Sequence, residues 1–287
     1  MGTTMDDTDR AAKASEADAR ETTAPADARE ATALTAACQG LAMADAFEDS
    51  EAVAPSGIAS RAGGRLGDAR ALLFDLDGTL IDTHDIILRS MRHAVNDVCG
   101  IGATDAKLMA GVGMPLFDQM MAFTGGDEVR SEEMVSIYRR HNDSIHDEGV
   151  DAFPGTADAL RRLRALGYPM GVVTSKRHHM AERGLKLCGI LGFFEFVIGS
   201  DDWPEHKPAP GPVLRGCELI GLAPAECVYV GDSPYDIQAG NAAGCMTAAA
   251  LWGMFPEREL SAEHPDVMCE SLEGLADVLE ASRHGSV

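Results

Sequence analysis

Two carboxylates stand at the end of a strand-like apolar run in this 287-residue chain. Asp75 and Asp77 follow Ala71–Phe74, and Gly78 and Thr79 continue into a turn. Side chains two residues apart at a strand end point the same way, and like charges so close need a cation or a shared proton between them. The pair therefore predicts a nucleophilic carboxylate beside a general acid/base.

Three later segments add polar side chains where further apolar runs end. Thr174 and Ser175 supply hydroxyls that could hold a phosphate oxygen, and Lys207 supplies a cation next to Pro208. The run that ends at Val230 leads to three more polar residues, Asp232, Ser233 and Asp236. Together the four segments offer a nucleophile, an acid, hydroxyl donors, a lysine and oxygen ligands of the kind Mg²⁺ prefers.

Short apolar runs alternate with helical patterns around these residues. We expect five strands, at Ala71–Phe74, Met170–Val173, Phe194–Ile198, Val228–Val230 and Thr247–Leu251. We expect helices between and after them, at Pro154–Leu166, His178–Cys188, Pro210–Ile220, Tyr235–Ala243 and Ser271–Glu280. This alternation predicts an α/β fold with a Rossmann-like parallel sheet and helices on both faces. The polar residues would meet at the carboxyl edge of that sheet, where ligands bind.

The segment from Ile81 to Val150 lacks a clear strand. Leu88, Met91 and Val95 recur at spacings of three and four, which predicts helices. We therefore expect a helical cap at residues 83–150, inserted in a core formed by residues 71–82 and 151–287.

Residues 1–70 contain only six large aliphatic or phenylalanine side chains. So few apolar side chains cannot bury enough surface to fold, which predicts a disordered tail rich in alanine and acidic residues. A tail that binds a partner protein is the alternative.

The formal net charge of −22 argues against a broad surface for nucleic acid or anionic membranes, because such surfaces need clustered Lys and Arg. The longest apolar run, Met246–Met254, is too short to span a bilayer. The first residues also lack the basic and then apolar pattern of a secretory signal, so we expect a cytoplasmic protein.

The four polar segments resemble the four motifs of the haloacid dehalogenase superfamily of phosphatases, in order and in spacing. DxDGT stands at 75–79, a strand-terminal Thr at 174, Lys207 in a KPxP context and GDSxxD at 231–236. The resemblance covers the predicted folded part of the chain. It is greatest to phosphoglycolate phosphatases and pyrophosphatases with a helical cap.

The resemblance implies a role for each matching residue. Asp75 would form an aspartyl-phosphate, and Asp77 would protonate the leaving oxygen and then activate water. Asp232 would bind Mg²⁺ together with the Asp75 carboxylate and the Asp77 backbone carbonyl. The transferring phosphoryl group would be held by Thr174, Ser175 and Lys207. Asp236 would support the metal shell, and Gly78, Thr79 and Ser233 would be further supporting residues.

The resemblance implies a Mg²⁺-dependent phosphatase for a small phosphorylated metabolite, such as a phosphoglycolate-like monoester or pyrophosphate. Asp77 favours phosphate chemistry, because the dehalogenases of the superfamily lack this second carboxylate. A sugar-phosphate mutase and a noncatalytic binding protein on the same fold remain alternatives. In the cap, Arg89, Arg92 and His93 are candidates for contacting a substrate carboxylate or second phosphate.

Overall fold

The computed structural model describes residues 66–284, so the predictions for residues 1–65 and 285–287 lie outside it. The described chain begins with a short 3-10 turn, η2 (Leu66–Asp68), whose Leu66 is buried in the core. The Arg70 amide donates a hydrogen bond of 2.8 Å to the Glu226 carbonyl. The core therefore includes Leu66, five residues before the predicted boundary at Ala71, because it buries the apolar surface of this side chain.

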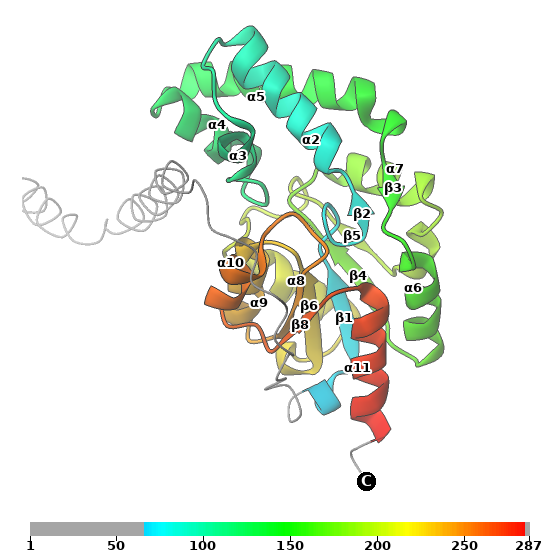
Figure 1. The fold of residues 1–287 in the computed structure, drawn as a ribbon. Helices are drawn as coiled ribbons and strands as arrows, with labels where there is room; N and C mark the ends of the chain where they lie inside the picture. The colour runs from blue at the N-terminus through cyan, green and yellow to red at the C-terminus, as the bar shows by residue number, and fades with distance from the viewer. Residues whose placement is uncertain (1–65, 285–287) are drawn as a thin grey trace, which may run out of the picture.

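A six-stranded parallel sheet forms the centre of the molecule (Figure 1). Its strands in chain order are β1 (Ala71–Phe74), β4 (Met170–Val173), β5 (Val197–Ile198), β6 (Cys227–Gly231), β7 (Met246–Ala250) and β8 (Val267–Cys269). They lie side by side in the order β5-β4-β1-β6-β7-β8. Phe74 at the end of β1 pairs with Val172 on one side and Val230 on the other, so three strands end together in the middle of one edge.

Helices cover both faces of the sheet, as predicted. They are α6 (Thr156–Ala165), α7 (His178–Leu187), α8 (Gly211–Ile220), α9 (Pro234–Ala243) and α11 (Leu272–His284). Successive side chains of a strand point to opposite faces, so Leu72 and Phe74 pack with α6, α7 and α11, whereas Ala71 and Leu73 pack with α8 and α9. Burial on both faces explains why β1 is apolar throughout. The predicted α/β class with a Rossmann-like parallel sheet is confirmed.

The observed elements differ from the predicted ones mainly at the sheet edges. The strand expected over Phe194–Ile198 is reduced to β5, because a 3-10 turn, η5 (Leu191–Phe193), leads into it. The edge strand β8 and helix α10 (Glu257–Ala262) were not predicted. Such short elements contain too few residues for periodicity to reveal them.

An antiparallel ribbon connects the sheet to a second group of helices. Its strands, β2 (Ile81–Asp82) and β3 (Asp151–Ala152), lie at the two ends of the segment predicted to be helical. The expectation that no strand begins at Ile81 therefore differs from the structure. Two paired residues suffice here because the ribbon only has to hold the ends of the segment together.

Between the ribbon strands lie α2 (His84–Met91), the π-helical η3 (Arg92–Val98), α3 (Asp105–Met109), α4 (Leu116–Thr124) and α5 (Glu128–Ile145). We call residues 83–150 the cap. Its helices share an apolar cluster of their own, which includes Met91, Val95, Leu108, Met120 and Met134. Figure 1 shows these helices together above the carboxyl edge of the sheet.

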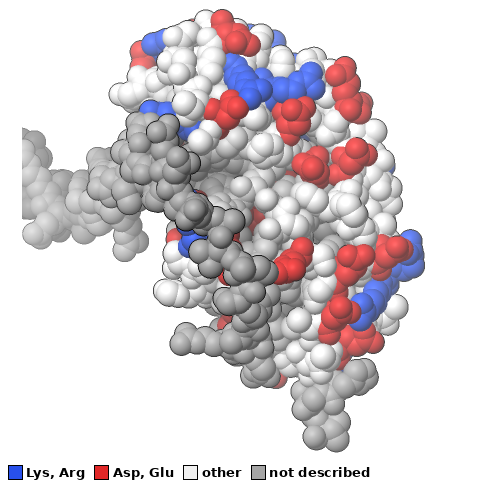
Figure 2. Space-filling model, viewed as in Figure 1, with Lys and Arg blue, Asp and Glu red and all other residues white. Residues whose placement is uncertain are grey.

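Basic side chains on the face drawn in Figure 2 lie beside acidic ones, both over the cap helices and next to α11. Ion pairs join Arg92 of η3 to Asp105 of α3, and Arg162 of α6 to Asp277 and Glu280 of α11. None of the helices formed by residues 66–284 is both long and apolar enough to cross a bilayer.

Candidate active site

The predicted site residues meet at the carboxyl edge of the sheet because three neighbouring parallel strands end there. Asp75 follows β1 and its amide donates to the Val230 carbonyl of β6 at 2.8 Å. Thr174 follows β4, and Asp232 follows β6. Residues from three distant parts of the chain are thereby brought to one place.

The turn after β1 depends on Gly78. Its φ of +83° lies in the left-handed region, and an added Cβ would come within 2.2 Å of Asp232 Oδ2. The turn brings the Thr79 hydroxyl to Asp232, to which it donates a hydrogen bond of 3.1 Å. Gly78 therefore allows the turn after β1 to lie against Asp232, and Thr79 holds it there through a hydrogen bond. This agrees with the supporting role predicted for both residues.

A buried lysine lies between two carboxylates behind the site. Lys207 Nζ is 2.9 Å from Asp75 Oδ1 and 2.5 Å from Asp236 Oδ1. Burial lowers the pKa of Lys207, but Asp236 and Asp75 more than reverse this, so its pKa lies well above the ordinary value. Lys207 is therefore a fixed positive charge next to Asp75.

The same burial acts in the opposite direction on the carboxyl groups. It raises the pKa of Asp75 to about 6, although Lys207 opposes the rise. It raises the pKa of Asp232 well above the usual value, and the charges of Asp236 and Asp75 raise it further. The ionised forms of these two neighbouring carboxylates are therefore disfavoured, and a bound cation would reduce their repulsion.

Protein donors occupy both oxygens of Asp236. Oδ1 accepts from Lys207, and Oδ2 accepts from the Ser233 amide at 3.1 Å and the Ser233 hydroxyl at 2.6 Å. Ser233 is also the N-cap residue of α9, which fixes this geometry at the start of the helix. Asp236 and Ser233 thus form a support for Lys207.

A divalent cation is consistent with the donor set at this edge. Asp75, Asp232 and Asp236 each place a carboxylate oxygen within 4.8 Å of the others. Asp75 Oδ1 is buried and accepts no hydrogen bond, although Lys207 Nζ is close to it. Asp75 and Asp232 line the cavity and Asp236 does not, so these two are the side chains best placed to bind a cation there. The hydrogen bonds that Asp232 accepts from Thr79 and from the Met254 amide hold its carboxylate in position.

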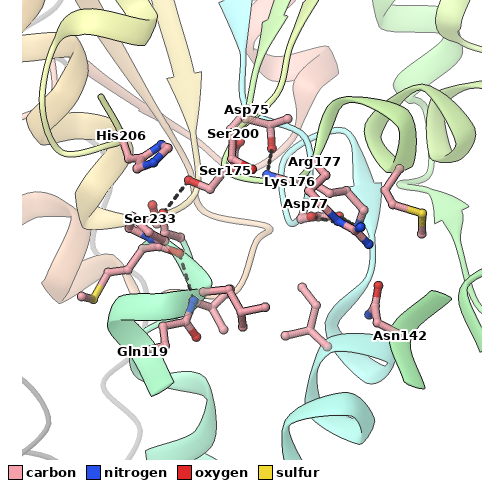
Figure 3. Close-up of a pocket in the computed structure, with 18 of the residues that line it drawn as sticks. Asp75, Asp77, Gln119, Asn142, Ser175, Lys176, Arg177, Ser200, His206 and Ser233 are labelled. Carbon is pink, nitrogen blue, oxygen red and sulfur yellow. Dashed lines mark hydrogen bonds and ion pairs between the residues drawn. The ribbon is translucent and has the colours of Figure 1, made fainter. Parts of the chain in front are cut away.

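Asp77 makes different contacts from the neighbouring carboxylates. Lys176 Nζ lies 2.9 Å from Asp77 Oδ1 and 3.0 Å from Oδ2, and the Thr83 hydroxyl donates to Oδ1 at 2.9 Å. Figure 3 shows Lys176 and Asp77 side by side in the pocket. The Asp77 side chain is outside the three-carboxylate group; the metal contact predicted for Asp77 concerns its backbone carbonyl and stays a prediction.

The two hydroxyl residues after β4 have separate positions. Thr174 is buried and its hydroxyl accepts a hydrogen bond of 3.2 Å from the Lys176 amide. The Ser175 hydroxyl donates to the Gly113 carbonyl of the cap at 2.8 Å. In this structure, Ser175 therefore connects core and cap.

A cavity of about 350 Å³ lies between the strand ends and the cap. Six of the predicted site residues line it, namely Asp75, Asp77, Thr174, Ser175, Asp232 and Ser233. The other four (Gly78, Thr79, Lys207 and Asp236) lie behind these residues and hold them through the contacts above. The site predicted from sequence is thus brought together, in two layers.

Other residues that line the cavity were not predicted from the sequence as site residues. Lys176 comes from the loop after β4, and Gln119, Arg139 and Asn142 come from cap helices (Figure 3 labels Lys176, Gln119 and Asn142). Lys176 could have been found, because it directly follows Thr174-Ser175. The three cap residues carry no such signal, since only the packing of the cap on the core brings them to the site.

The cap candidates Arg89, Arg92 and His93 are not among the residues that line this cavity. Arg89 pairs with Asp85, Arg92 pairs with Asp105, and the His93 ring stacks on His141. All three therefore contact other cap residues and do not reach the cavity.

Comparisons with known proteins agree with this fold and site. Residues 72–250 match the family described as haloacid dehalogenase-like hydrolase. A Clostridium perfringens protein named "Putative pyrophosphatase PpaX" is 39% identical over 211 residues, covering 74% of this chain and 97% of the relative. Pyrophosphatase PpaX of Bacillus velezensis is 37% identical over 208 residues, covering 72% of this chain and 95% of the relative.

A solved structure from Lactobacillus plantarum, titled as a "putative phosphoglycolate phosphatase", superposes with a TM-score of 0.66 at 26% identity. The match covers 74% of this chain and 98% of that one. The family match spans more than half of the chain and includes all four motif segments. The chain belongs to the haloacid dehalogenase-like hydrolase family.

Proposed function

We propose that this protein is a Mg²⁺-dependent phosphatase that hydrolyses a small phosphorylated metabolite, either a phosphoglycolate-like monoester or pyrophosphate. One observation carries the proposal: Asp75 lines the cavity with Asp232 beside it and the charge of Lys207 only 2.9 Å away. This arrangement gives a carboxylate nucleophile with a neighbouring positive charge. The names of the relatives, pyrophosphatase and phosphoglycolate phosphatase, support the same substrate range.

The first half of the reaction transfers the phosphoryl group to Asp75. A carboxylate oxygen of Asp75 bonds to phosphorus, and the bond from phosphorus to the leaving oxygen breaks. The leaving oxygen takes a proton from Asp77, which lines the same cavity two residues further along. Lys207 offsets the charge of the phosphoryl group from behind Asp75, and the Thr174 and Ser175 segment binds its oxygens.

The second half releases phosphate. Water attacks the phosphorus of the aspartyl-phosphate and gives a proton to Asp77, and the bond between phosphorus and Asp75 breaks. Both residues return to their starting states. A Mg²⁺ ion held by Asp75, Asp232 and the Asp77 carbonyl would supply charge neutralisation for the transferring group. Asp236 and Ser233 position Lys207 throughout.

We further propose that the cap covers the substrate during turnover, because residues 83–150 contribute one wall of the cavity. The bond from Ser175 to Gly113 is one contact between core and cap that would change as the cap opens. The cytoplasmic location, and the absence of nucleic-acid and membrane partners, remain predictions based on the sequence.

The test is release of orthophosphate from a panel of phosphate monoesters and pyrophosphate, with Mg²⁺ and after its removal by a chelator. We expect turnover with Mg²⁺ and a loss of about 10⁴-fold or more in Asp75→Asn. Equal rates in wild type and Asp75→Asn would overturn the proposal. Isomerised sugar phosphate without free orthophosphate would indicate a mutase, and binding without any conversion would indicate a noncatalytic protein.

A further inference from the structure

Lys176 occupies a distinctive position in the cavity. Its ammonium group contacts both oxygens of Asp77, at 2.9 and 3.0 Å, and only 11% of its side chain is exposed. In the proposed function, Asp77 gives its proton to the leaving oxygen. The geometry therefore places the Lys176 charge next to the leaving group and away from the transferring phosphoryl group, which lies at Asp75 and Lys207.

A second cation reaches the cavity from the cap. Arg139 of α5 lines it, and its guanidinium makes no hydrogen bond or ion pair within the described part of the chain. Burial and the charge of Arg177 lower the pKa of Arg139, while Asp143 and Asp201 partly offset this. Arg139 thus lies near another cation with its hydrogen-bond donors available.

Arg177 lines the same cavity but already has a partner. Its guanidinium donates to both oxygens of Asp143, at 2.9 and 3.2 Å, and it remains about a quarter exposed. We therefore separate it from Lys176 and Arg139, which we call the cationic pair.

We propose that the cationic pair selects substrates whose leaving group is itself anionic, with Lys176 shifting from Asp77 to that group and Arg139 closing on it from the cap. A phosphate or a carboxylate on the leaving side would be neutralised, whereas an uncharged alcohol would leave both cations without a partner. This inference rests on the proposed function, since it uses the reaction to define the leaving side.

The first experiment compares kcat/KM for pyrophosphate, phosphoglycolate and ethyl phosphate. In Lys176→Met, the preference for pyrophosphate over ethyl phosphate should fall about 10- to 100-fold, the effect of losing a charge-assisted hydrogen bond. In Arg139→Gln, it should fall about 3- to 10-fold because this side chain is exposed. Lys176→Arg should retain more of the preference than Lys176→Met. If Lys176→Met lowers kcat/KM more for phosphoglycolate than for pyrophosphate, a carboxylate is the preferred anion on the leaving group.

The matched control is Arg140→Gln, on the same helix. Arg140 bonds to Ser136 and does not line the cavity, so all three rates should change less than twofold. If Lys176→Met lowers the rates for pyrophosphate and ethyl phosphate equally, the residue supports the site without selecting the leaving group, and the inference is wrong.

A binding experiment separates this inference from the proposed function. Calorimetry with Mg²⁺ would compare pyrophosphate and orthophosphate binding to Asp75→Asn, with and without Lys176→Met. We expect the second substitution to weaken pyrophosphate binding about 10-fold more than orthophosphate binding. Equal weakening, or no pyrophosphate binding at all, would overturn the inference. If pyrophosphate binding weakens more than orthophosphate binding, as expected, but the wild-type protein turns over no substrate, only the proposed function is overturned.

Discussion

The two walls of the cavity are built differently. On the sheet side, Asp75, Asp232, Asp236 and Lys207 are almost completely buried, and neighbouring groups fix their positions. We call these four residues the carboxylate cluster. On the cap side, Arg139 is exposed and without a partner among the described residues, and Asn142 and Gln119 each donate a bond only to another cap residue.

We infer from this difference that the sheet wall serves the reaction and the cap wall serves the choice of substrate. Within the carboxylate cluster, removing Asp236 takes away the nearer partner of the buried Lys207 charge, which is strongly unfavourable. At the exposed Arg139 of the cap wall, water can replace a lost contact. We therefore expect the cluster to tolerate little change and the cap to allow changes that alter specificity without unfolding the protein.

After Asp75→Asn, the largest effect should follow Asp232→Asn. This change removes a charge that would hold the cation while keeping a similar shape, so we expect kcat to fall roughly 10³-fold at ordinary Mg²⁺ concentrations. The measurement is steady-state orthophosphate release over a range of Mg²⁺ concentrations, with circular dichroism to check the fold. Near-native kcat at the same Mg²⁺ concentration would show that Asp232 is not a metal ligand.

Asp236→Asn should have the next largest effect, on stability. It removes the partner 2.5 Å from the buried Lys207, and breaking such a pair costs about 4 kcal/mol of unfolding free energy. Arg177→Gln, which breaks the more exposed pair with Asp143, should cost less than about 1 kcal/mol. Urea unfolding of both variants measures the contrast. Equal losses would contradict the distinction between the two walls.

A smaller effect depends on pH and concerns the metal-free protein. Burial raises the pKa of Asp75 from 3.8 to about 6, so between these values the folded state binds a proton that the unfolded state lacks. Asp75 is therefore neutral and well tolerated at low pH, but its charge destabilises the fold as the pH rises through 6. The stability of Asp75→Asn relative to wild type should therefore be greater at pH 7.5 than at pH 4, and this difference reports the charge of Asp75.

The difference should shrink as the pH falls from 6 toward 4. Urea unfolding in a chelating buffer at several pH values tests this, with Asp158→Asn on the surface as control. A difference between wild type and Asp75→Asn that stays constant with pH would show that burial does not raise this pKa. Adding Mg²⁺ at pH 7.5 should restore part of the wild-type stability, because bound ligands stabilise the folded state.

The smallest effect is expected in the outer part of the cap. Arg92 is exposed, and neither Arg92 nor its partner Asp105 is among the residues that line the cavity. Arg92→Gln should change kcat/KM less than twofold and stability by less than about 1 kcal/mol. A tenfold change in kcat/KM for pyrophosphate would instead indicate that Arg92 contacts the substrate. The part of the cap that acts on the substrate would then extend beyond α5.

The sequence predicted the central strands better than the edges. β1 and β4 have the predicted bounds, because strands buried on both faces are short apolar runs with polar ends. β2 and β3 were missed because two-residue strands carry no periodic signal. Leu66 was placed in the tail because one leucine among alanines gives no pattern, although the core buries it.

The sequence by itself determined which residues could do the chemistry, because each polar segment directly follows an apolar run. Only the tertiary structure decided which of those residues contact one another. It joined Lys207 to Asp75 and Asp236, and it joined Lys176 to Asp77 across 99 positions of the chain. Local spacing controls the direction of neighbouring side chains, whereas such pairs form only when separate strands and the cap pack together. The packing therefore placed Lys207 beside Asp75 and Lys176 beside Asp77.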